Sequence, residues 1–263
     1  MTWKIEEVEK TPKLKDPVLI EGMPGIGNVG KVAVDFLIDE LDAKKIYELF
    51  SYTFPHSVFV NEENMVELPK IEIYHANFKG KDILLLAGDV QPIDEVSCYE
   101  FCEELLKIFR KLKGKEIITL GGIGLQNIPK KPKVYCTGNE KKMIKTYCEG
   151  TKASNDLKGV VGPIVGVSGL LLGLAGKEDI PAISLLSETF GHPMYLGVKG
   201  AREILKILNM KMDLGIDLKD LDKEIKKLEE DMMKKTEELT DVSKTTAINK
   251  VKNKFGKETS YIG

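Results

Sequence analysis

The chain has 263 residues, of which 42% are hydrophobic and 30% are charged, and its formal net charge is −2. These values suit one globular domain of about 200 residues with an appendage, or two small domains. The balanced charge provides no basic field for nucleic acid, so we expect no nucleic-acid partner. The N-terminal sequence MTWKIEEVEK is charged where a secretory signal requires an apolar segment. We therefore expect a cytoplasmic protein.

Cysteines and histidines are few and scattered, and neither C-x-x-C nor H-x-x-x-H occurs. Four cysteines in a chain of this length are too few for a disulfide scaffold, so we expect reduced thiols. A histidine-based metal site needs clustered ligands, and the sequence predicts no metal site. The residues concerned are Cys98, Cys102, Cys136, Cys148, His56, His75 and His192.

Short apolar runs alternate with helical patterns along the first two hundred residues. The expected strands are residues 18–21, 46–50, 66–75, 83–87, 116–120, 134–137 and 182–186. The expected helices are residues 28–41, 94–112, 139–148, 168–175 and 196–208. Strands separated by helices predict a three-layer α/β fold with a largely parallel sheet. Ligands of such folds bind at the carboxyl ends of the strands.

The composition changes after about residue 212, which predicts a core domain at 1–212 and a helical extension at 213–263. Within 217–242, eight positions follow an a/d heptad register and all but one are apolar. These positions are Leu218, Leu221, Ile225, Leu228, Met232, Lys235, Leu239 and Val242. A narrow apolar seam cannot stabilise an isolated helix in water. It therefore packs on its own core, on a second subunit or on a partner, and we expect the last residues, 258–263, to be mobile.

Residues 159–176, GVVGPIVGVSGLLLGLAG, form an uncharged run that approaches the length of a membrane span. The run contains Pro163 and six glycines, and no neighbouring segment is apolar enough to form a membrane bundle with it. We therefore expect no membrane partner, and a buried turn that leads into a closely packed core helix.

The glycine-rich segment 22–32, GMPGIGNVGKV, lies between an expected strand and an expected helix. Gly25, Gly27 and Gly30 match a dinucleotide fingerprint, whereas Gly25, Gly30 and Lys31 nearly complete a P-loop. Val32 replaces the hydroxyl residue that would hold magnesium, and Glu48, the only acid at the fingerprint distance, lies inside its strand. We therefore predict a structural turn without cofactor; if a cofactor binds, these are the residues that hold it.

No complete catalytic constellation is visible. Ser168 lies in a sequence that misses the nucleophile elbow, and Glu188 at the end of an expected strand has no matched second carboxylate.

Four segments resemble, in their order and spacing, the archaeal homologs of eukaryotic proteasome assembly chaperones. The segments are GMPGIGNVGKVAVDFL, SVFVNEENMVELPKIEIYHA, GPIVGVSGLLLGLA and IPAISLLSETFGHP. The resemblance implies a core like that of purine nucleoside phosphorylases, homo-oligomers, and ATP-independent help in assembling the α-ring of the proteasome. Members of the family are also labelled ATP-grasp-like enzymes or carboxylate–amine ligases, a label that no lysine-and-acid pattern of this sequence supports.

One branch of that family ends in hydrophobic-Tyr-any residue, a tail that docks between proteasome α subunits. This chain ends Ser260, Tyr261, Ile262, Gly263, with the tyrosine one position too early. The sequence thus resembles the branch without a proper docking tail, which argues against direct activation of the proteasome. The resemblance implies proteasome core α subunits, an adaptor or another chaperone subunit as partners.

The preferred interpretation is a non-catalytic, homo-oligomeric assembly chaperone or scaffold. The alternatives are an enzyme or sensor that binds a nucleotide on the glycine-rich segment, and a scaffold for an unrelated complex. Candidate partner-binding residues are Leu221, Ile225, Leu228, Met232, Tyr261, Ile262 and Gly263.

Overall fold

The computed structural model describes residues 3–157, 159, 162–193, 195–219, 222, 223 and 226. The strands are β1 (Trp3–Glu7), β2 (Val18–Glu21), β3 (Lys44–Ser51), β4 (Phe59–Val60), β5 (Val66–Glu67), β6 (Ile71–Phe78), β7 (Lys81–Gly88), β8 (Glu116–Leu125), β9 (Val134–Gly138), β10 (Ala153–Ser154) and β11 (Ala182–Phe190). The helices are the 3₁₀ turn η1 (Ile26–Asn28), α1 (Val29–Glu40), α2 (Glu95–Lys111), α3 (Lys141–Cys148), α4 (Val167–Lys177) and α5 (Val198–Met212).

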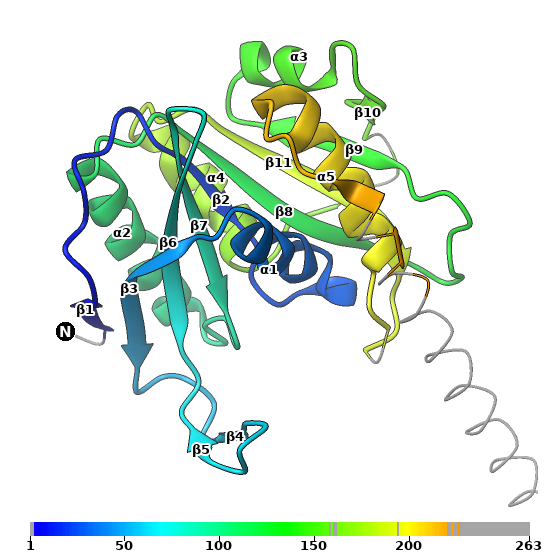
Figure 1. Cartoon of the computed structure of the whole chain (residues 1–263). Coiled ribbons are helices and arrows are strands. Elements are labelled where there is room, and N and C mark those ends of the chain that lie inside the picture. Colours follow the sequence, from blue (N-terminus) through cyan, green and yellow to red (C-terminus); the bar gives the residue numbers. More distant parts are fainter. Residues whose placement is uncertain are drawn as a thin grey trace, which may run out of the picture. The chain divides into compact units, whose positions relative to one another are not determined.

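One large sheet forms the centre of the core, and Figure 1 shows its strands fanned between the helices. Its order among the described strands is β1-β3-β6-β7-β2-β8-β11-β9-β10. The four central strands β7, β2, β8 and β11 run parallel, whereas β6 and β9 on either side are antiparallel to them. The expected α/β fold is confirmed, with a sheet that is parallel in its centre and mixed as a whole.

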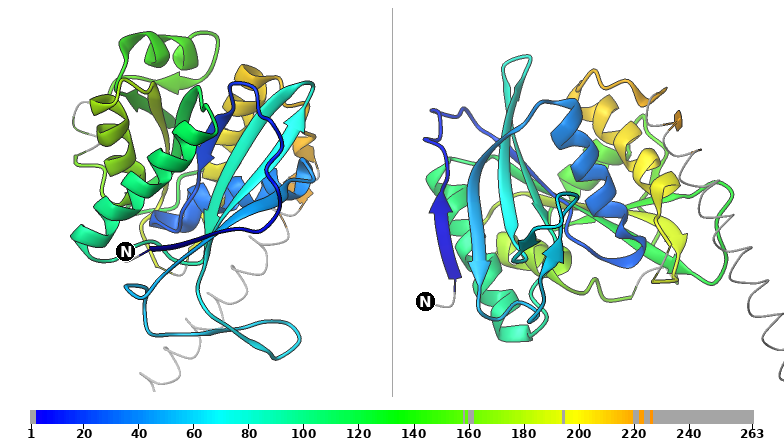
Figure 2. Two further views of the ribbon diagram at one scale, coloured as in Figure 1. Left: turned by 90° about the vertical axis from the view of Figure 1, so that its left-hand side faces the viewer. Right: turned by 60° about the horizontal axis from the view of Figure 1, so that its bottom comes forward.

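Helices cover both faces of this sheet (Figures 1 and 2), with α1 and α5 on one face and α2 and α4 on the other. Strand register aligns Leu19 of β2 with Leu84 of β7 and Ile117 of β8, and this row packs in the core beneath α2 and α4. Side chains alternate between faces along a strand, so Ile20, which is also buried, faces the opposite helix layer. Burial on both faces explains why the central strands are continuous apolar runs.

Strands and helices lie close to the positions predicted from periodicity, with three informative differences. The expected strand 66–75 is divided into β5 and β6, because Pro69 lies between them and has no N–H for a strand ladder. Strands β8 and β11 continue to Leu125 and Phe190, where they pair in parallel. Strand β1, an edge strand with charged residues, was missed by the pattern although its Trp3 packs against Phe101.

The uncharged run that ends in α4 is only partly buried. The helix buries Leu171 and Leu172, as expected, but the described residues before it, including Pro163 and Val165, are exposed. The prediction of a buried turn was therefore wrong, because this segment lies over the outer surface of the α2–α4 layer. None of the described helices has the length and apolarity that a membrane crossing requires.

The chain divides into two compact units, Met1–Ile216 and Asp217–Gly263. In the second unit a helical segment starts at Leu218, and the Asp217 carboxylate accepts a hydrogen bond from the Lys219 amide at 2.8 Å. That bond is the N-cap that the sequence predicts. Most of the heptad seam and the whole of the C-terminal tail lie outside the described residues.

Candidate functional site

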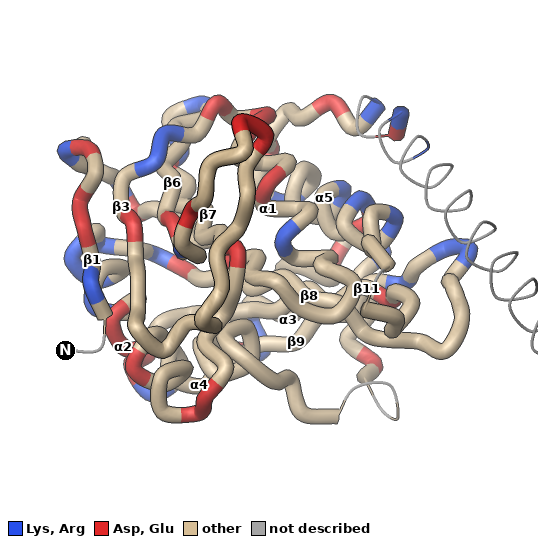
Figure 3. Tube along the Cα trace, turned by 90° about the horizontal axis from the view of Figure 1, so that it is seen from below, with Lys and Arg blue, Asp and Glu red and all other residues tan. Residues whose placement is uncertain are grey.

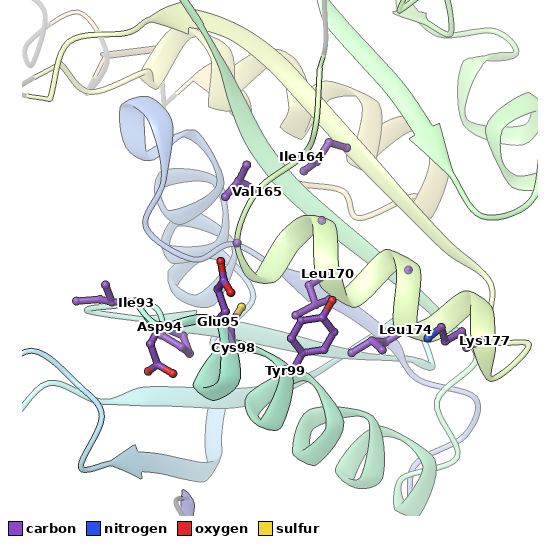
Figure 4. Close-up of a pocket in the computed structure, with 14 residues that line it drawn as sticks. Ile93, Asp94, Glu95, Cys98, Tyr99, Ile164, Val165, Leu170, Leu174 and Lys177 are labelled. Atoms are coloured by element: carbon purple, nitrogen blue, oxygen red, sulfur yellow. The ribbon is translucent and has the colours of Figure 1, made fainter.

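An apolar groove of about 420 Å³ runs between α2 and α4 (Figure 4). In Figure 4, Tyr99 of α2 reaches towards Leu170 and Leu174 of α4, and Ile164 and Val165 lie above the start of α4. Asp94 and Glu95 line one part of the groove and Lys177 another. The surface is thus apolar along its length and charged at its rim.

Local hydrogen bonds fix the two helices that form the groove. Asp94 caps α2, because its carboxylate accepts a hydrogen bond from the Ser97 amide at 2.8 Å. The Gln91 side chain joins α4 to the glycine-rich turn, since it accepts a bond from the Val167 amide and donates one to the Pro24 carbonyl. The start of α4 is therefore tied to the glycine-rich turn of the core.

Several large apolar side chains around the groove are exposed to solvent. Val165 is 83% exposed and Ile93 is 74% exposed, and Tyr99, which also lines the groove, is exposed as well. A contiguous exposed apolar patch on a folded domain marks a surface for binding a protein or ligand. The groove is the strongest candidate for such a surface on this helix layer.

Three buried polar residues form a row across the sheet on the face that α4 covers. Glu21, Thr119 and Ser184 are paired in register on β2, β8 and β11, and all three side chains are inaccessible to solvent. Within the described part of the chain, Glu21 Oε2, Thr119 Oγ1 and Ser184 Oγ have no hydrogen-bond partner. Buried polar atoms without partners are uncommon in proteins.

Burial raises the pKa of Glu21 to about 7. The raising effect of desolvation exceeds the lowering effect of hydrogen bonds from the Met23 amide and the Ser168 hydroxyl. Glu21 thus changes charge near neutral pH in the interior of the protein, beneath the helix that lines the groove.

The glycine-rich turn between β2 and α1 is tightly packed against other backbone segments. A Cβ on Gly30 would lie 2.4 Å from the Leu120 carbonyl oxygen, and one on Gly22 would lie 2.2 Å from the Gly30 carbonyl oxygen. Gly27 has φ +62°, a conformation that favours glycine, and its carbonyl accepts a hydrogen bond from the Gly197 amide at 2.7 Å. Close packing accounts for Gly22 and Gly30, and the left-handed backbone accounts for Gly27.

The charged residues considered as candidate site residues take part in local ion pairs or hydrogen bonds. Lys31 pairs with Asp35 one helical turn later at 3.0 Å, and Glu48 pairs with Lys45 on β3 at 3.0 Å. Glu188 accepts hydrogen bonds from the Tyr135 hydroxyl and the Lys133 amide. Gly25, at the start of the turn, is loosely packed: a Cβ there would have its nearest neighbour 3.9 Å away.

The cysteines are unpaired, with Cys98 and Cys102 adjacent on α2 and both buried. The hydrogen bond with Cys98, followed by burial, raises the pKa of Cys102, which keeps this thiol protonated. Among the described residues, no group of three or more histidine, cysteine or acidic side chains is arranged as a metal site.

The candidate partner-binding residues of the extension lie outside the described residues. These are Leu221, Ile225, Leu228, Met232, Tyr261, Ile262 and Gly263. Neither the groove nor the buried row of Glu21, Thr119 and Ser184 was predicted from the sequence. The groove could have been suspected from two exposed apolar residues, Ile93 just before an amphipathic helix and Tyr99 on its outer side.

A model of the PAC2 family matches residues 19–236. The chain belongs to the PAC2 family. This PAC2 protein is 31% identical over 246 residues to the uncharacterized protein MJ1210 of Methanocaldococcus jannaschii, covering 89% of this chain and 91% of the relative. The family predicted from the four sequence segments is therefore confirmed.

Solved structures of PAC2-like proteins share this fold. The Pyrococcus furiosus protein PbaB, described as an archaeal proteasome activator, is 34% identical with a TM-score of 0.81, covering 90% of this chain and all of that one. PbaA of the same organism, described as an archaeal homolog of proteasome-assembly chaperone, is 25% identical with a TM-score of 0.72, covering 93% and 97% of the two chains.

Proposed function

We propose that this PAC2 protein is a non-catalytic, ATP-independent, homo-oligomeric chaperone or scaffold that acts in the cytoplasm on core α subunits of the proteasome or on a related adaptor. The observation that carries the proposal is the similarity to PbaB, which extends over 90% of this chain and the whole of PbaB. Similarity to PbaA along nearly the full length of both chains supports the same class of partner.

The surface of the core supports a protein partner more than a small substrate. The groove between α2 and α4 is open and apolar, with exposed Ile93, Tyr99 and Val165 along it. Interfaces between proteins are built on such apolar centres with polar rims. The glycine-rich turn, which would serve an enzyme, is filled by packed backbone at Gly22 and Gly30.

Native mass spectrometry with and without purified proteasome α subunits tests the proposal directly. We expect the protein alone to have a multimeric mass, and a mixed complex to form on addition of α subunits without ATP. Sedimentation at micromolar concentration provides a second measure of self-association. A monomer that binds no α subunit under either condition would refute the proposal.

For the extension we propose that 217–242 is one helix with a buried seam and that 258–263 extends to contact a partner. Leu228→Asp places a charge in the seam, which is expected to loosen the oligomer or the fold by a few kcal/mol. Deletion of 260–263, which removes Tyr261, Ile262 and Gly263, is expected to spare stability and oligomer size and to weaken partner binding. A lower melting temperature with unchanged binding would instead place the tail in the core.

A further inference from the structure

A short arm, residues 56–68, extends from the core between Pro55 and Pro69. Figure 1 shows its strands β4 and β5 below the ends of β3 and β6. Val58, Val60, Val66 and Leu68 are between 51% and 66% exposed. An exposed cluster of branched aliphatic side chains is unusual on a surface that meets only water.

Hydrogen bonds at the tip hold the arm as a hairpin. Asn61 Oδ1 accepts bonds from the Glu63 and Met65 amides at 3.0 and 2.9 Å, and Asn61 Nδ2 donates to Glu67 Oε1 at 2.6 Å. Val60 is paired opposite Val66, so these two side chains share one face of the hairpin. The arm thus presents a preformed apolar face.

An isolated two-stranded hairpin is at best marginally stable in water. Covering its aliphatic face would stabilise the hairpin, because it removes apolar surface from water. The surface that covers the hairpin must therefore be partly apolar.

The arm is acidic, with Glu62 and Glu63 at its tip and Glu67 on β5. Packing of two arms against each other would place these carboxylates near their equivalents, which is unfavourable. The charge therefore favours a basic, partly apolar surface located elsewhere on the chain.

The loop between β8 and β9, residues 126–133, provides such a surface. Ile128 is 53% exposed, and Lys130, Lys131 and Lys133 are exposed around it. Across the described ranges, no carboxylate lies within ion-pair distance of these three ammonium groups. Figure 3 shows basic residues on this loop, at the far right of the core and well away from the strands that bear the arm.

We propose that the arm of one copy packs on the 126–133 loop of a second copy, with the Val60–Val66 face against Ile128 and Glu62 and Glu63 beside Lys130 and Lys131. The inference rests on the homo-oligomer of the proposed function and specifies how it is built. The two surfaces lie on different parts of the chain, so each copy of a closed oligomer takes part in two such contacts, one through its arm and one through its loop.

Charge reversal tests this contact in the full-length protein. Glu62→Lys with Glu63→Lys, or Lys130→Glu with Lys131→Glu, places like charges across the interface. We expect native mass spectrometry and light scattering to show each double variant shifted from oligomer to monomer. The variant that carries all four substitutions restores opposite charges and is expected to regain the wild-type mass. An equimolar mixture of the two double variants is expected to assemble as well.

Matched controls change the net charge by the same amount at exposed sites away from both surfaces. Asp39→Lys with Glu40→Lys at the end of α1, and Lys141→Glu with Lys142→Glu on α3, are expected to keep the wild-type mass. Thermal melting confirms that each variant is folded.

The outcomes separate this contact from the proposed function. A monomeric wild-type protein would overturn both. An oligomeric wild type that tolerates both double variants, or a four-fold variant that remains monomeric, would overturn the arm–loop contact alone and leave the homo-oligomer standing.

Discussion

Two glycine-rich, uncharged segments of this chain have opposite structural roles. In residues 22–30 the glycines allow backbones to approach, so that no space for a Cβ exists at Gly22 or Gly30. In α4, a Cβ on Gly173 would have no neighbour within 4 Å, and this glycine lines the open groove. Glycine is therefore required for close backbone packing in the turn, whereas in α4 it lies beside open space. Neighbouring residues from distant elements determine how much space surrounds each glycine.

The largest expected loss of stability comes from adding a side chain at Gly30 in the tightly packed turn. Gly30→Ala would force a Cβ against the Leu120 carbonyl, which cannot move aside without disturbing β8. We expect a loss of about 3 kcal/mol in the free energy of unfolding, measured by urea titration. The matched change Gly173→Ala in the open region is expected to stabilise α4 by about 0.5–1 kcal/mol.

Gly25→Ala is a further control inside the same turn, because Gly25 has an extended backbone and space for a Cβ. Its free energy of unfolding should stay near that of the wild type. If Gly30→Ala is equally harmless, close packing does not explain the turn.

The second prediction concerns Glu21 beneath the groove. The pKa of the folded carboxyl is about 7, whereas the ordinary pKa of a glutamate is 4.5. The folded state then binds more protons between pH 4.5 and 7, so this group lowers stability as the pH rises through that window. The difference corresponds to about 3 kcal/mol.

Glu21→Gln should remove the part of the pH dependence of stability that is due to this carboxyl group. The free energy of unfolding, measured at half-unit steps from pH 5 to 8, should fall less steeply in the variant than in the wild type. Parallel curves would show that Glu21 has an ordinary pKa and that the interior of the sheet is better hydrated than the structure indicates.

Smaller effects on stability are expected from substitutions in the groove between α2 and α4. Ile93→Ser with Val165→Ser removes two exposed side chains from the groove, so the free energy of unfolding should change by less than about 0.5 kcal/mol. Binding of proteasome α subunits, measured by surface plasmon resonance, should weaken if the groove contacts the partner. Unchanged affinity would assign partner binding to another surface.

The smallest effect, none at all, is expected from nucleotides. ATP or NAD at millimolar concentration, with or without magnesium, should leave the melting temperature unchanged. A ligand at about 100 times its dissociation constant would add ~2.7 kcal/mol of stability. A reproducible rise of several degrees would favour the nucleotide-binding enzyme over the chaperone.

Much of the secondary structure could be predicted from the sequence, because it follows from the spacing of apolar residues within each segment. Strand β2 has its predicted bounds, and α2 begins after the predicted Asp94. The arm was not predicted: its valines alternate over too few residues to distinguish a hairpin from an extension of β6, and only Pro69 marks the boundary.

The sequence by itself determined the α/β class, the family and the position of the glycine-rich turn, because apolar periodicity and ordered segments are properties of the chain. Tertiary structure decided that backbone packs tightly against Gly30, whereas the space beside Gly173 is open. It also brought Glu21, Thr119 and Ser184 into one buried row. These features depend on the order and register of β2, β8 and β11, which are separated by many residues along the chain. Periodicity reports how one segment alternates between inside and outside, whereas contact between such segments depends on which strands become neighbours.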